Sequence, residues 1–138
     1  MKNLLRLEEL VQFLFCLSGL LISDVPWWVY VLLAIGPDIG ILGYAVNTKV
    51  GSIAYNFLHH KGLALLLVVG GWYLNLMNVL DQGHLPNWGV LTIVGLILYG
   101  HASLDRIFGY GLKFGDSFQH THLGWIGKGS PSGMQNDQ

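Results

Sequence analysis

The chain is poor in charged residues and in cysteine. Of its 138 residues, only 11 % are Asp, Glu, Lys or Arg, whereas 52 % are hydrophobic. In soluble domains, about a quarter of all residues are charged, so this composition favours a membrane protein. The net charge of −1 lacks the basic surplus that nucleic-acid binding needs, so no nucleic-acid partner is expected. Cys16 is the only cysteine, which excludes an internal disulfide.

Long apolar runs, by contrast, are abundant. Four of them predict membrane-spanning helices, because a span needs about 20 residues. They cover residues 4–22, 27–46, 50–77 and 88–112. The predicted fold is therefore all-α, a four-helix transmembrane bundle formed by residues 1–113. We expect residues 114–138 to be a cytoplasmic tail that is ordered to about residue 126, folds against the cytoplasmic mouth and is flexible beyond it.

The positions of lysine and arginine predict the orientation. Cations lie beside only one set of helix ends, at Lys2, Arg6, Lys49, Lys113 and Lys128. The opposite loops contain acidic residues and no cation. By the positive-inside rule, both termini are predicted to be cytoplasmic, in a bacterial inner membrane.

Polar side chains nevertheless occur inside the predicted spans, where a charge costs roughly 2.5–3.5 kcal/mol to insert. A helical rise of 1.5 Å per residue places them at similar depths, roughly 6–18 Å from the cytoplasmic side. They are Glu8, Asp38, Asn56, His59, His101 and Asp105. His101 and Asp105 are four residues apart and so share one helix face. The sequence therefore predicts one polar layer inside the bundle.

Imidazole and carboxylate groups from separate helices are typical ligands of zinc, iron or manganese. The predicted ligands of a divalent metal ion are Asp38, His59, His101, Asp105 and, from the tail, His122. Glu8 is expected to be a further ligand or, like Asp105, a catalytic general base.

The remaining polar residues are expected to surround this site. Asn56, Tyr55 and Tyr110 are predicted to hydrogen-bond to the ligands. Arg106 and Lys113 are predicted either to hold an anionic substrate or lipid headgroup, or only to reach the interface with their charged ends.

Other interpretations stay open at this level. His101 and Asp105 also suit a plain buried hydrogen-bonded pair, and Asp38 suits a carboxylate that satisfies backbone donors at the Pro37 kink. Facing histidines, such as His59 or His60 opposite His101, would also suit haem.

The same residues lie in runs that resemble a known family. The runs are Leu5–Glu8, Pro37–Asp38, Gly43–Tyr44, Tyr55–Asn56 with His59, His101 with Asp105–Arg106, Gly109–Lys113 and Thr121–Gly124. They resemble domain-of-unknown-function family 4260, an uncharacterised family of bacterial four-helix membrane proteins, over about residues 4–126. The resemblance implies a four-helix membrane protein without an established activity. It places Glu8 and His122 on the family pattern and leaves Glu9, His60 and His120 off it.

Three functions from different classes follow. The first is a metal-dependent membrane enzyme, most plausibly a hydrolase that acts on an amphipathic or anionic substrate. The second is a proton or metal-ion transporter or channel subunit, which would need a homo-oligomer because four helices are few for a pathway. The third is a structural or accessory subunit in which the polar layer only fixes helix packing. A haem-binding redox protein is a further alternative.

Overall fold

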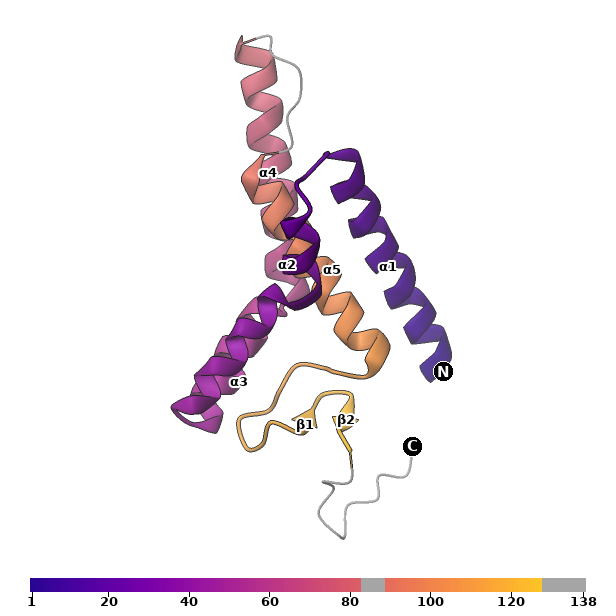
Figure 1. Ribbon diagram of the computed structural model, residues 1–138, viewed down its shortest axis with the longest axis vertical. Coiled ribbons are helices and arrows are strands. Elements are labelled where there is room, and N and C mark those ends of the chain that lie inside the picture. Colours follow the sequence, from indigo (N-terminus) through magenta and orange to yellow (C-terminus); the bar gives the residue numbers. More distant parts are fainter. Residues whose placement is uncertain (83–88, 128–138) are drawn as a thin grey trace.

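The computed structural model describes residues 1–82 and 89–127, and these residues are mainly helical (Figure 1). The helices are α1 (Lys2–Ile22), α2 (Trp28–Ile35), the 3-10 helix η1 (Gly36–Ala45), α3 (Thr48–Leu58), α4 (Lys61–Gln82) and α5 (Val90–Phe108). After α5, the strands β1 (His120–Thr121) and β2 (Gly124–Trp125) pair as a short antiparallel hairpin.

The helices bear out the all-α prediction at a coarse level. Within the described residues, three helical stretches are long and apolar enough to cross a membrane: Trp28–Ala45, Thr48–Asp81 and Val90–Phe108. The remaining helix, α1, has 21 residues but carries four charged side chains in its first eight positions. Four helical segments are thus present, and three of them have the character of membrane spans.

Two of these segments are not the continuous helices that the sequence predicts. Pro37 lacks a backbone N–H, so α2 ends just before it and the chain continues as η1. The third segment breaks at His59 and His60, between α3 and α4. The fourth ends at Phe108, four residues early, because Gly109 takes a left-handed φ of 91° and caps α5.

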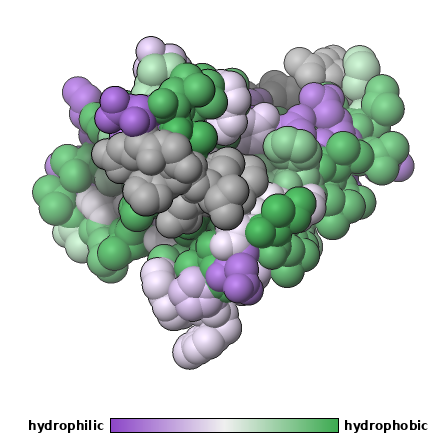
Figure 2. Space-filling view, turned by 90° about the horizontal axis from the view of Figure 1, so that it is seen from above, coloured by the Kyte–Doolittle hydropathy of each residue, from purple (hydrophilic) through white to green (hydrophobic). Residues whose placement is uncertain are grey.

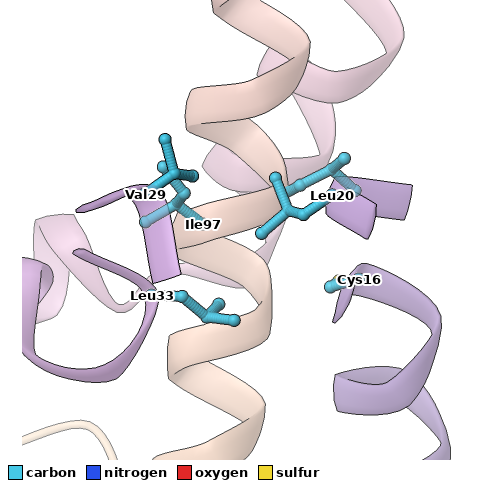
Figure 3. Packing of buried hydrophobic residues seen from close by; sticks show 6 residues of the cluster. Cys16, Leu20, Val29, Leu33 and Ile97 are labelled. Atoms are coloured by element: carbon cyan, nitrogen blue, oxygen red, sulfur yellow. The ribbon is translucent and has the colours of Figure 1, made fainter. Parts of the chain in front are cut away.

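Helix α5 lies at the centre of the packing and contacts α1, α2 and α4 (Figure 1). Its buried face meets α1 on one side and α2 on the other (Figure 3). The buried apolar cluster is Cys16, Leu20, Val29, Leu33, Leu96 and Ile97. This core fixes α5 against the two N-terminal helices. It thereby also positions His101 and Asp105, which lie on α5.

Glycines allow the closest contacts. A Cβ on Gly100 would lie 2.8 Å from Leu33 Cδ1, so the side chain of Leu33 on α2 packs directly against the backbone of α5. A Cβ on Gly40 would lie 2.9 Å from Tyr55 Cα, and η1 packs along α3 in the same way. The η1–α3 pair projects from the other helices in Figure 1. The first contact joins α2 to α5, and the second joins η1 to α3.

The outer surface is apolar. Large side chains such as Phe15 and Leu66 are 74 % and 71 % exposed, respectively. Hydrophobic residues cover much of the face seen in Figure 2. Such a surface would aggregate in water but suits a hydrocarbon solvent.

The tail after α5 folds back on the helices. The side-chain amide of Asn56 accepts a hydrogen bond from Lys113 N–H (2.7 Å) and donates one to Lys113 C=O (2.8 Å). The N-terminal end of α1, the C-terminal end of α5 and the β1–β2 hairpin lie at one end of the molecule (Figure 1). The predicted flexibility of the chain beyond residue 127 falls outside the described residues.

Candidate metal centre

Four polar side chains meet where the two helix breaks face α5. Asp38 lies in the first turn of η1, His59 caps the C-terminal end of α3, and His101 and Asp105 lie one turn apart on α5. One ligand atom from each lies within 4.8 Å of all the others. Because these four residues could hold a metal ion, we call them the metal centre.

Each imidazole Nε2 faces both carboxylates. His59 Nε2 lies 3.3 Å from Asp105 Oδ2 and 3.7 Å from Asp38 Oδ1. His101 Nε2 lies 3.4 Å from Asp38 Oδ1 and 3.8 Å from Asp105 Oδ1. Ligands at about 2.1 Å from a tetrahedral ion lie about 3.4 Å from one another, whereas a charge-assisted hydrogen bond spans about 2.7–2.9 Å. The measured spacing fits shared coordination better than direct ion pairing.

The kink at Pro37 orients His101. In an uninterrupted helix, the carbonyl of Leu33 would accept a hydrogen bond from the N–H of residue 37, but proline has none. His101 Nδ1 lies 3.0 Å from that free carbonyl oxygen. Because a carbonyl only accepts, Nδ1 carries a proton and donates it, and in the neutral ring Nε2 faces the centre with its lone pair.

Tyr55 orients His59 in a similar way. Its carbonyl oxygen lies 2.8 Å from His59 Nδ1, so this imidazole also donates from Nδ1 and turns Nε2 inward. The Tyr55 ring stacks on the His59 ring with centroids 3.7 Å apart. The Tyr55 hydroxyl donates a hydrogen bond to Asp105 Oδ2. One residue of α3 thus holds a histidine and a carboxylate of the metal centre.

The metal centre is electrostatically incomplete. His59 and His101 are 3 % and 1 % exposed, and neither Nε2 has a hydrogen-bond partner in the part of the chain that the structure describes. A buried polar atom without a partner costs roughly 1–3 kcal/mol, and here lone pairs also face carboxylates. A shared cation would satisfy all four groups at once. Asp38 is 38 % exposed, so the centre is closed behind the imidazoles and open on the Asp38 side.

Lys113 lies close to this centre but does not contact it through a hydrogen bond. Its side chain is only 4 % exposed, and Nζ finds no hydrogen-bond partner within residues 1–82 and 89–127. Three rings surround this ammonium group, with centroids 4.2 Å away for Phe118, 5.1 Å for Tyr55 and 5.6 Å for Tyr110. Burial lowers the pKa of Lys113, and the charges of Asp105 and Asp38 oppose that shift.

The other predicted site residues lie elsewhere. Glu8 is exposed and accepts a hydrogen bond from Gln12 Nε2 at 3.2 Å. Arg106 points toward α1, where its Nη1 lies 3.4 Å from Glu9 Oε1. His122 accepts a hydrogen bond from the Leu112 N–H at Nδ1 (2.8 Å) and lines a separate cavity with Arg106. The structure does not bring Glu8, Arg106 or His122 to the metal centre.

Two residues that make important polar contacts in the structure are not singled out in the sequence analysis: Leu33, which orients His101, and Glu9 on α1. The Leu33 carbonyl could have been found from its position four residues before Pro37. The motif resemblance favours Glu8 over Glu9, yet the Glu9 side chain is the less exposed of the two, at 15 %, and it pairs with Lys61 and Arg106. The spacing along α1 indicates which glutamate faces the protein interior. Glu9 lies seven residues before the buried Cys16 and therefore on the same face of the helix.

These observations define a helical protein of membrane type with a buried histidine–aspartate cluster at two helix breaks. The chain belongs to the family described as Domain of unknown function (DUF4260), whose model matches residues 2–126. The family that the sequence motifs resemble is thereby confirmed. No curated protein and no solved structure gives a significant match to this chain.

Proposed function

We propose that the protein is a membrane-embedded, metal-dependent enzyme of the hydrolase type. Asp38, His59, His101 and Asp105 hold a divalent cation, and zinc, iron and manganese suit this mixture of nitrogen and oxygen ligands. One observation carries the proposal: two buried Nε2 atoms without hydrogen-bond partners among the described residues face two carboxylates, and one ligand atom from each of the four side chains lies within 4.8 Å of the others. The membrane is a bacterial inner membrane, with both termini on the cytoplasmic side.

The helix breaks support a functional role for the centre. An irregular backbone at membrane depth is tolerated where it is buried in protein or lines a site. Here the break at Pro37 supplies the carbonyl that orients His101, and the break after Leu58 places His59 at the end of α3. Both interruptions therefore serve the ligands directly.

In the proposed reaction, a divalent ion held by these four residues would supply the Lewis-acid chemistry that the hydrolysis of a carbonyl or phosphoryl group needs. Asp105 is the proposed proton acceptor. The Tyr55 hydroxyl, which donates a hydrogen bond to Asp105 Oδ2, holds this carboxylate in position. The ammonium group of Lys113, buried and without a hydrogen-bond partner among the described residues, binds an anionic group of the substrate. The substrate is thus an anionic or amphipathic molecule that enters on the Asp38 side.

The alternatives fit the geometry less well. A transport path would need polar groups beyond the metal centre, yet α4 from Leu63 to Leu80 and α5 from Val90 to Tyr99 contain no acid and no histidine. The His59 and His101 rings make a T-shaped contact with centroids 4.9 Å apart, which leaves no room for a haem between them. A polar layer that only fixed helix packing would not be stabilised by His59 Nε2 and His101 Nε2, because neither atom has a hydrogen-bond partner among the described residues.

Elemental analysis of the purified full-length protein tests the metal centre. We expect about one transition-metal ion per chain in the wild type and close to none in His101→Ala. His60→Ala is the matched control, because His60 is the exposed neighbour of His59 and lies outside the centre. A wild-type content far below one ion per chain that is unchanged in His101→Ala would overturn the proposal.

Enzymatic activity needs its own test. The metal-loaded protein in detergent is assayed against ester and phosphodiester lipids, before and after removal of the ion with a chelator. Hydrolysis that disappears on chelation, returns with added metal and is lost in Asp105→Asn supports a hydrolase. A stoichiometric metal content without turnover on any of these substrates would reduce the proposal to a metal-binding protein.

A further inference from the structure

A cavity lies away from the metal centre, between the N-terminal end of α1, the C-terminal end of α5 and the tail. Its volume is about 280 Å³. Small-molecule sites usually measure about 300–1,000 Å³, so this cavity is sized for a headgroup rather than for a whole amphiphile. Its polar lining consists of Lys2, Arg6, Glu9, Arg106 and His122.

The cavity carries an excess of positive charge. Lys2, Arg6 and Arg106 bring three cations against the single carboxylate of Glu9. That carboxylate is already engaged, since it also pairs with the ammonium group of Lys61. The excess charge therefore remains to attract an anion.

His122 adds a directed donor to these charges. Its Nδ1 accepts the backbone N–H of Leu112, so the proton of the neutral ring sits on Nε2. Burial, and then the nearby charge of Arg106, lower the pKa of His122, which keeps the ring neutral near pH 7. A neutral histidine held in this tautomer donates one hydrogen bond without adding a charge.

The remaining walls of the cavity are apolar. Leu5 on α1 and Leu123 in the tail line it, and both are also exposed on the outer surface. Leu4 and Leu7, on neighbouring positions of α1, are exposed as well. Cations beside an apolar helix surface match an amphiphile whose charged group lies at the membrane interface.

We propose that this cavity binds the phosphate headgroup of an anionic phospholipid. Arg6, Arg106 and Lys2 contact the phosphate oxygens, the acyl chains lie along the apolar face of α1, and the tail residue His122 closes the site. Arginine suits phosphate because its planar fork can donate two hydrogen bonds to one group. This lipid site is separate from the metal centre and does not depend on a bound metal ion.

Lipid binding to the full-length protein in detergent tests the proposal. Short-chain phosphatidic acid is titrated against the wild type by native mass spectrometry, with short-chain phosphatidylcholine as the zwitterionic comparison. We expect clear preference for phosphatidic acid, and an approximately fivefold weaker affinity in Arg6→Gln, the effect of one cation near an anionic group. Lys2→Gln should weaken binding in the same direction. Both replaced residues are exposed, so folding should persist.

Lys49→Gln is the matched control, since Lys49 is an exposed cation of another helix and does not line the cavity. Its affinity for phosphatidic acid should equal that of the wild type. Equal affinity for the two lipids, or equal losses in Arg6→Gln and Lys49→Gln, would overturn the site. Displacement of the lipid by millimolar inorganic phosphate would overturn the assignment to a phospholipid and indicate a site for free phosphate.

Discussion

Two polar clusters join the helices of this protein, and they differ in whether their groups are satisfied. In the first, which we call the ion-pair network, Lys61 Nζ donates to Glu9 Oε2 and, at 2.6 Å, to Gln12 Oε1. Tyr99 donates to the same amide oxygen at 3.1 Å, and Arg106 approaches Glu9 at 3.4 Å. The network links α1, α4 and α5 with donors facing acceptors.

The metal centre shows the opposite arrangement. Its Nε2 atoms and carboxylate oxygens are all acceptors when the imidazoles are neutral, and they face one another. A cluster that only held helices together would be expected to pair donors with acceptors, as the ion-pair network does. The difference is consistent with an ion-pair network that stabilises the fold and with the proposal that the metal centre holds a cation.

Removing one member of the ion-pair network should have the largest effect on stability. In Glu9→Gln, the ammonium group of Lys61 stays largely buried without its counter-charge, which costs about 3–5 kcal/mol in comparable pairs. Thermal unfolding in detergent measures the loss, and metal content should stay unchanged. Glu8→Gln is the control and should stay within about 0.5 kcal/mol of the wild type, because Glu8 is exposed. Equal losses in the two variants would contradict this role of Glu9.

The metal centre should respond to the ion instead. At a free metal concentration about 100-fold above Kd, binding to the folded state adds about 2.7 kcal/mol. We therefore expect a chelator to lower the unfolding temperature of the wild type, and added metal to restore it. Asp38→Asn should abolish this response, since it removes one ligand without removing volume. The Glu9→Gln variant should have a lower unfolding temperature than the wild type, but chelator and added metal should shift that temperature by the same amount. A response of equal size in Asp38→Asn would mean that the ion binds elsewhere.

Pro37 tests how the fold prepares the metal centre. Pro37→Ala restores an N–H that competes with His101 for the Leu33 carbonyl, so the imidazole loses the group that orients it. Loss of such a partner typically lowers metal affinity by about 10–100-fold. Helix propensity meanwhile favours alanine, so stability without metal should not fall. Isothermal titration with zinc measures the affinity, and Pro26→Ala in the α1–α2 turn serves as the control. Unchanged zinc affinity in Pro37→Ala would show that the carbonyl does not position His101.

Several parts of this picture could be predicted from the sequence. Apolar runs place the helices, and simple depth arithmetic puts Asp38, His59, His101 and Asp105 in one layer, where the structure brings them together. This worked because a helix has a fixed rise, and because polar groups at membrane depth must converge.

Other parts depend on the local backbone, which periodicity does not report. The run from residue 50 to 77 contains no proline at the break, so it predicts one long helix and does not indicate the break between α3 and α4. The path of the tail follows from the left-handed turn at Gly109, and it carries His122 toward Arg106 rather than toward the metal centre. Whether Glu8 or Glu9 faces the protein interior depends on how α1 is oriented about its axis, and the rise per residue does not give this orientation.

The smallest effect is expected in the tail, at an exposed pair that belongs to neither cluster. His120 Nδ1 lies 2.7 Å from Asp116 Oδ2, and its ring stacks on Trp125 with centroids 4.5 Å apart. The hydrogen bond from His120 lowers the pKa of Asp116 below its ordinary value of about 3.9. Because the folded pKa is the lower one, the pair favours the folded tail above the unfolded pKa. That contribution is lost as pH falls through the folded pKa.

Hydrogen exchange of residues 113–126 measures this effect. Protection in the wild type should be equal at pH 7 and pH 5 once intrinsic exchange rates are corrected, and it should decrease by pH 3. Asp116→Asn should show the weaker protection at all three values, while the metal content and the unfolding temperature of the helices stay unchanged. Exposed pairs contribute little to global stability, so a change confined to the tail is the expected result. If Asp116→Asn matched the wild type at pH 7, the stacking of His120 on Trp125 would suffice to hold the hairpin without the carboxylate.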